Sequence, residues 1–136
     1  MMNYALLCGS APNDYWQKKI ISMYNFLLSD KGGSIPDKNI CMFPNGIEDV
    51  TIEIVLNNIL SGKAGDIPNG IFIYICSQYP VSDDENSVWL GNIEIKKNMI
   101  AKYQTIASDS GIDFQIIYDT DKSFISDETL GYEKVV

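Results

Sequence analysis

An uninterrupted apolar segment stands in the middle of the sequence, Gly70-Ile71-Phe72-Ile73-Tyr74-Ile75-Cys76, and Ser77-Gln78-Tyr79-Pro80 follow it directly. A run of this kind, rich in β-branched residues and without alternation, is typical of a strand that is buried on both faces. In open α/β sheets, ligands and catalytic groups lie just beyond the carboxyl ends of such strands. The sequence therefore predicts that any site of this chain lies next to Cys76, Ser77 and Gln78.

Strand-like and helix-like segments alternate on either side of this run. Strands are predicted at residues 4–8, 40–43, 71–76 and 114–118, and a short hairpin strand at 88–90. A first helix begins at Asp14 and stops before Lys31-Gly32-Gly33, and a second begins near Asp49 or Thr51 and is ended by Ser61-Gly62. The alternation predicts right-handed crossovers and an α/β fold, a three-layer αβα sandwich with a mainly parallel sheet, in a single domain spanning residues 1–136. The strand order does not follow from this pattern.

Each predicted helix has an apolar face. Asn92 is interpreted as the N-cap of the third helix, which stops at Ser110-Gly111. The face of the first helix comprises Trp16, Ile20, Met23, Tyr24, Leu27 and Leu28. That of the second comprises Ile52, Val55, Leu56, Ile59 and Leu60. That of the third comprises Ile95, Met99, Ile100, Tyr103, Ile106 and Ala107.

Composition excludes several classes of function. The chain of 136 residues has a net charge of −8, no histidine, and lysine as its only basic residue type. Nucleic acid and anionic membrane surfaces are therefore not expected as partners. Without histidine there is no Ser-His-Asp or Cys-His machinery and no imidazole ligand for a metal. No cofactor is predicted.

The cysteines and the N-terminal residues indicate the cellular compartment of the protein. Cys8, Cys41 and Cys76 each lie in or at the end of an apolar run, which favours reduced, buried thiols. The N-terminal residues lack the pattern of a signal peptide, and no apolar run is long enough to span a bilayer. We therefore expect a cytoplasmic protein.

Several short motifs occur in a characteristic order. The first strand ends in Gly9-Ser10, and the first helix leads to the turn Ser34-Ile35-Pro36-Asp37-Lys38-Asn39-Ile40. Val50-Thr51 open the second helix, Ile71–Tyr74 form the central strand, and Ile116–Ser123 run from the last strand into an acidic segment. In this order the motifs resemble the caspase-like fold of cysteine peptidases, with the legumain branch nearest, over about residues 4–124.

The resemblance assigns the family's catalytic positions to residues that cannot perform its chemistry. The catalytic histidine position falls on Gln78, and the nucleophile position falls on Asp121. A carboxamide does not exchange protons near neutral pH, and a carboxylate is a poor substitute for a thiolate. Only the large-subunit core has a counterpart, because nothing after residue 124 resembles the small subunit. The resemblance therefore implies a pseudopeptidase, and this fold commonly pairs through an edge strand.

The candidate site residues surround the predicted carboxyl edge of the sheet. Gln78 and Asp121 are the vestigial dyad positions, and we expect their side chains to lie close together. The candidate binding residues are Ser10, Asp14, Cys76, Ser77, Asp119 and Ser123. Cys76 is either a reactive thiol or a packed core thiol.

Two further features have alternative interpretations. Asp119 and Asp121 could bind Mg²⁺ or could be a solvated pair that closes a strand. Likewise, Asp83-Asp84-Glu85 either bind Ca²⁺ or form a solvated loop. No metal site is assigned.

Three functions are consistent with these residues. The first is a non-catalytic caspase-like domain that binds a protein partner, or a second copy of itself, as a regulatory module. The second is a divalent-metal-dependent hydrolase that uses Asp119 and Asp121 with Asp14. The third is a cysteine peptidase activity that is reconstituted with a partner chain.

Overall fold

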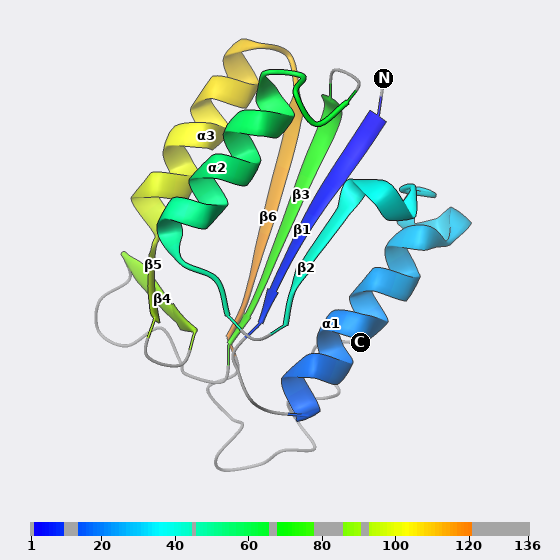
Figure 1. Cartoon of the computed structure of the whole chain (residues 1–136), viewed down its shortest axis with the longest axis vertical. Helices are drawn as coiled ribbons and strands as arrows, with labels where there is room; N and C mark the ends of the chain where they lie inside the picture. Colours follow the sequence, from blue (N-terminus) through cyan, green and yellow to red (C-terminus); the bar gives the residue numbers. More distant parts are fainter. Residues whose placement is uncertain are drawn as a thin grey trace.

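The structure is a computed structural model that describes residues 2–9, 14–44, 46–65, 68–77, 86–90 and 93–120. Its centre is a sheet of four parallel strands (Figure 1). The strands are β1 (Met2–Gly9), β2 (Ile40–Phe43), β3 (Pro68–Ser77) and β6 (Asp113–Thr120), in the order β2-β1-β3-β6. The predicted α/β class and parallel sheet are confirmed, and the segment 71–76 lies in an interior strand as expected.

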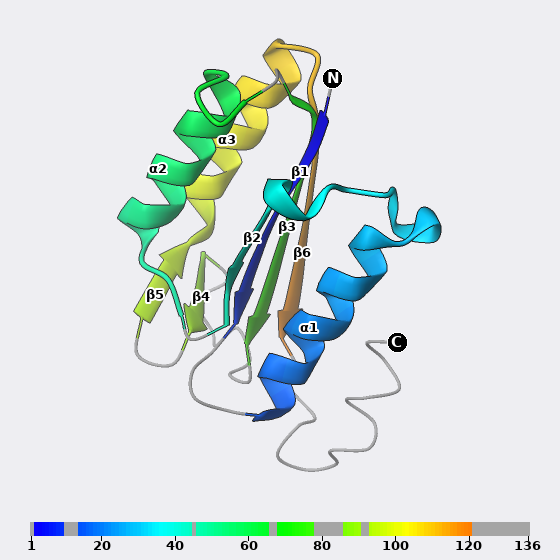
Figure 2. The same cartoon turned by 45° about the vertical axis from the view of Figure 1, so that its right-hand side comes forward.

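Helices lie on both faces of the sheet, as Figure 2 shows. Helices α2 (Asp49–Leu60) and α3 (Lys97–Asp109) cover one face, and α1 (Asp14–Leu28) lies on the other. This arrangement is compatible with the predicted three-layer sandwich. None of the helices in the described part of the chain is long and apolar enough to cross a membrane.

Strand alternation sorts the core into two clusters, because successive side chains point to opposite faces of a sheet. Leu6 and Cys8 of β1 and Ile73 of β3 point toward α2 and α3. The other face is packed by Leu7 of β1 and Tyr74 of β3, which face α1. After a register shift between Met2 and Asn3, strands β1, β3 and β6 run in matched register, so residues that pair across them share a face.

The end of α1 is set by glycines. After Leu28 the chain forms the short 3₁₀ helix η1 (Asp30–Gly32), and a second 3₁₀ helix, η2 (Asp37–Asn39), leads into β2. A Cβ atom on Gly32 would lie 1.9 Å from the carbonyl oxygen of Phe26, so no larger residue fits at that turn. Gly33 follows with φ of +100°, a conformation that favours glycine.

The region before α3 corrects one prediction. Residues Ile93–Lys96 form strand β5, which pairs antiparallel with β4 (Ser87–Leu90), and α3 begins only at Lys97. Ile95 therefore belongs to the hairpin and not to the helix face, and Asn92, which lies outside the described residues, is too early to cap the helix. The physical reason is the alternation Ile-Glu-Ile-Lys, a period of two that fits a strand. The predicted short strand at 88–90 is present, but its partner is β5, part of which was assigned to the third helix.

Two residues assigned to buried helix faces are exposed. Leu28 is 36% exposed at the end of α1, and Ile106 is 42% exposed on α3. Both lie at the margin of the apolar stripe of their helix. The rest of both stripes that the structure describes is buried or half-buried, whereas the side chain of Trp16 is not described.

Candidate functional site: a buried ion pair and an apolar groove

Most of the predicted site positions fall where the structure makes no statement. Gln78, Asp121, Ser10 and Ser123 lie outside the described residues. The side chains of Asp14 and Ser77 are likewise not described, although both residues lie in described elements. The proximity of Gln78 and Asp121 thus remains a prediction. The strands that lead to them are adjacent, and Ser77 pairs with Thr120.

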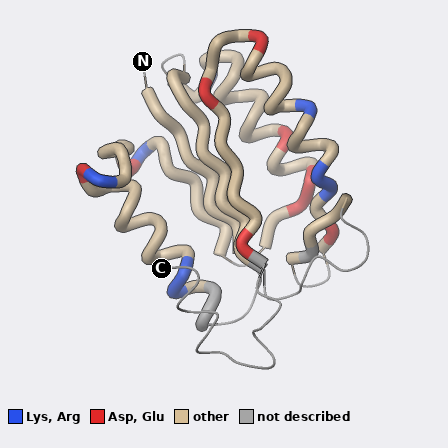
Figure 3. The backbone as a smooth tube through the Cα atoms, turned by 180° about the vertical axis from the view of Figure 1, so that it is seen from behind, with Lys and Arg blue, Asp and Glu red and all other residues tan. Residues whose placement is uncertain are grey.

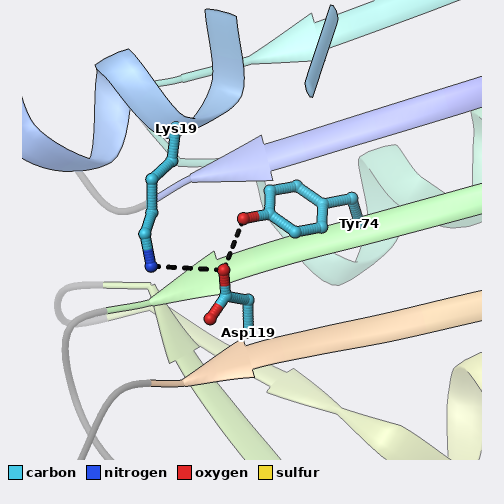
Figure 4. Close-up of polar contacts among 3 residues, drawn as sticks. All are labelled: Lys19, Tyr74 and Asp119. Carbon is cyan, nitrogen blue, oxygen red and sulfur yellow. Dashed lines mark hydrogen bonds and ion pairs between the residues drawn. The ribbon is translucent and has the colours of Figure 1, made fainter. Parts of the chain in front are cut away.

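The remaining positions, Cys76 and Asp119, lie in a polar cluster near the carboxyl ends of β3 and β6. Figure 4 shows Lys19 of α1 and Tyr74 of β3 converging on Asp119 of β6. The Nζ of Lys19 lies 3.2 Å from Oδ2 of Asp119, and the hydroxyl of Tyr74 donates to the same oxygen over 2.5 Å. Oδ2 of Asp119 thus accepts hydrogen bonds from side chains of α1 and β3, two elements that are distant in sequence from Asp119.

Local sequence explains why these groups meet. Cys76 and Asp119 are paired residues of neighbouring strands, and Tyr74 lies two positions before Cys76, so all three side chains point to the α1 face. Lys19 lies on α1 three residues after Trp16 and four before Met23, which places it within the apolar stripe of the helix. The stripe packs on the sheet and brings the ammonium group to the carboxylate.

The cluster is largely shielded from water. The side chain of Lys19 is 6% exposed and that of Asp119 is 14% exposed. Burial, the neighbouring Cys76 and the Asp119 carboxylate together raise the pKa of Tyr74 far above its ordinary value. The phenol therefore stays protonated and acts as a hydrogen-bond donor, not as a general base.

The thiol of Cys76 is fully buried in the same cluster. Cys8 is also fully buried, and burial raises the pKa of its thiol strongly, with a further contribution from Cys41. Cys41 is half-buried, and burial raises the pKa of this thiol too. All three cysteines are free thiols. A nucleophilic cysteine needs a lowered pKa and access to solvent. Cys8 and Cys41 lack the lowered pKa, and Cys76 lacks the access.

The chemistry of Asp119 is that of a structural carboxylate. Its charge is balanced by Lys19, and its Oδ2 atom already accepts two hydrogen bonds. No group of three or more Cys, Asp or Glu side chains that could hold a metal ion exists within the residues that the structure describes. A metal bound at Asp119 would have to displace the ammonium group of Lys19.

Sequence reasoning missed Lys19 and Tyr74 as partners of Asp119. A signal for Lys19 was present, because a lysine inside the apolar stripe of a helix needs a buried acceptor or a route to water. A signal for Tyr74 was also present, since a buried tyrosine hydroxyl usually finds a partner. Neither signal names Asp119, which is 100 positions away from Lys19.

At the opposite end of α1, a groove of about 360 Å³ opens between the helix and the sheet. Its walls include Phe26 of α1, Phe72 of β3 and Ile117 of β6. Phe26 is 50% exposed and Ile117 is 46% exposed, so the groove presents apolar surface to solvent. Gly32 and Gly70 line it as well and contribute no side chains that would fill it.

The groove and the ion pair lie at opposite ends of the same helix–sheet contact. Lys19 holds the first half of α1 near the carboxyl ends of β3 and β6, and Figure 2 shows the other half of the helix running away from the sheet. The groove reaches the amino ends of these strands at Gly70 and Asp113. It is therefore a different site from the one predicted at the carboxyl edge.

Comparison with family models, with curated proteins and with solved structures gives no match for this chain. The resemblance to caspase-like peptidases thus rests on the motifs quoted above.

Proposed function

We propose that this chain is a non-catalytic, protein-binding module of caspase-like fold, which acts by occupying a partner and not by cleaving it. The observation that carries the proposal is the apolar groove between α1 and β6. Phe26 and Ile117 are each about half exposed there, and β6 lies at the end of the sheet. Apolar side chains that are exposed together at a groove favour an interaction site.

The polar cluster supports the non-catalytic part of the proposal. Its groups satisfy one another: Asp119 accepts from Lys19 and Tyr74, and the raised pKa of Tyr74 keeps the phenol neutral. A catalytic constellation instead contains a group that is poised to gain or lose a proton near the working pH. The cluster is better suited to holding α1 on the sheet, which keeps the wall of the groove in place.

The same ion pair is an argument against a metal-dependent hydrolase built on Asp119. Two-metal and one-metal hydrolases need carboxylates that are open toward the ion. The carboxylate of Asp119 is turned toward Lys19 and Tyr74 (Figure 4). We therefore propose the binding module alone.

Affinity capture with matched surface variants tests the proposal. Wild-type protein and Phe26→Lys serve as baits, and Ile54→Lys is the control, because Ile54 is 55% exposed on α2, on the other face of the sheet. A partner of this site is retained by the wild type and by Ile54→Lys and lost by Phe26→Lys. A partner retained equally by all three baits would contradict the proposal, and so would metal-dependent or cysteine-dependent turnover.

A further inference from the structure

We infer that the groove receives an extended peptide that adds as a strand to the outer edge of β6, with large apolar side chains at alternate positions and a basic residue facing Asp113. This inference rests on the proposed function and specifies the partner's chemistry. It joins two features that lie side by side, the outer edge of β6, which no strand of the described part of the chain pairs with, and the apolar groove next to it.

The first feature is the edge itself. Within the described ranges β6 pairs with β3 alone, so the N–H and C=O groups on its other side have no strand partner there. Proteins usually protect such an edge with lysine, proline, a bulge or a very short strand. The opposite edge strand, β2, has only four residues, whereas β6 has eight.

The sequence of β6 carries none of these protections in its middle. Residues 114–118 read Phe-Gln-Ile-Ile-Tyr, with no charge, no proline and no glycine. Figure 3 shows that the strands of the sheet are uncharged over most of their length. Strand pairing is therefore the interaction for which this edge is suited.

The second feature, the groove, determines which side chains of the added strand contribute to binding. Asp113, Gln115 and Ile117 point to the α1 face and line the groove, so every second side chain of an added strand points to that face too. Successive side chains on that face are about 7 Å apart along the strand. They would pack beside Ile117 and toward Phe26. A helical ligand could fill the groove but could not pair with the backbone of β6.

Charge distinguishes a peptide from a second copy of the chain. Each copy carries a net charge of −8, so two copies repel one another, whereas a basic peptide is attracted. Asp113 of the edge strand is exposed and lines the groove, and it accepts a 3.4 Å hydrogen bond from Nε2 of Gln115. Lys31 of η1 also lines the groove, whereas Asp113 lies on the edge strand itself.

Selection from a random nonapeptide display library against the purified full chain tests the inference. We expect recovered peptides to carry large apolar residues at every second position and at least one Lys or Arg. Their synthetic forms should bind Ile117→Lys and Phe26→Lys at least about tenfold more weakly than wild type. Binding to Ile54→Lys should stay within about twofold of wild type, by fluorescence anisotropy.

Two further readouts separate strand addition from other modes. Bound peptide should slow hydrogen exchange at β6 amides that point away from β3, which filling of the groove alone would not do. Asp113→Asn should weaken the binding of basic peptides and leave that of neutral ones unchanged. Glu48→Gln is the control, because Glu48 is exposed at the start of α2 and does not line the groove. Rising salt should weaken wild-type binding.

Several outcomes would overturn the inference. Recovery of peptides whose apolar residues have a helical spacing would contradict it. Failure to recover any peptide that binds wild type more tightly than Phe26→Lys and Ile117→Lys would also contradict it. Unchanged exchange at β6 would also do so, as would a wild-type dimer that Ile117→Lys dissociates. If peptides fail while a folded partner is still captured through Phe26, the inference is wrong and the proposed function stands; if both fail, both are wrong.

Discussion

Replacing Asp119 by asparagine should destabilise the fold through the charge that it leaves behind. The substitution keeps the shape and an acceptor for Tyr74 but removes the carboxylate that Lys19 meets at 3.2 Å. Breaking a fully buried ion pair from one side costs about 3–5 kcal/mol. The Asp119 side chain is 14% exposed and asparagine can still accept a hydrogen bond, so we expect a loss of about 2–3 kcal/mol. This corresponds to a fall in Tm of about 6–12 °C for a domain of this size.

Urea denaturation followed by circular dichroism measures this loss, with an unchanged m-value as evidence that only stability has changed. Glu53→Gln is the matched control, because it breaks an exposed ion pair. The Nζ of Lys102 lies 3.5 Å from Oε1 of Glu53, and the two side chains are 60% and 36% exposed. That change should cost less than about 0.5 kcal/mol. Adding Lys19→Met to Asp119→Asn should recover part of the loss, since no buried ammonium group remains. An Asp119→Asn loss as small as that of Glu53→Gln would refute the reasoning.

Three other predictions concern two tyrosines and the absence of peptidase activity. Tyr74→Phe removes the hydroxyl that donates to Asp119 and should lower the free energy of unfolding by about 1.5 kcal/mol in the same assay; an unchanged midpoint would contradict this. Burial raises the pKa of Tyr118 to about 12, and an unfolded tyrosine ionises near pH 10, so unfolding releases a proton between these values and stability falls as pH rises from about 10 to 12. Tyr118→Phe should flatten that fall by up to about 1 kcal/mol after solvent screening, and an equally steep fall in the variant would exclude this tyrosine as a cause. The purified protein should cleave no peptide with Asn, Asp, Arg or Lys at the scissile position, and turnover abolished by Cys76→Ala would make that thiol a nucleophile and contradict the pseudopeptidase interpretation.

Periodicity predicted most of the fold because the apolar patterns of this chain are regular. The run at 71–76 lies in β3 and is buried except at the half-buried Phe72, and Ile52, Leu56 and Ile59 form the buried face of α2 as their spacing indicates. The strand order depended on which edges pair in space, and no local pattern records that. The hairpin before α3 was assigned in part to the helix because four residues, Ile93–Lys96, are too few to separate a period of two from one of 3.6.

The site was harder to predict for a related reason. The rule that sites lie at carboxyl ends of parallel strands pointed to Asp119, which lies in a structural ion pair, and the partners of Asp119 come from α1 and from β3. The groove depends on the angle at which α1 leaves the sheet and on the absence of side chains at Gly32 and Gly70. These are properties of packing and not of sequence spacing.

The two fully buried thiols lie on opposite faces of the sheet, Cys8 among the residues under α2 and α3, and Cys76 among those under α1. A thiol reagent can reach each of them only when its own layer opens, so the rate of modification at each cysteine measures the opening free energy of that layer. Equal rates at Cys8 and Cys76 would show that both helical layers separate from the sheet in one cooperative event. Faster modification of Cys76 would show that α1 detaches first while the rest of the protein stays folded.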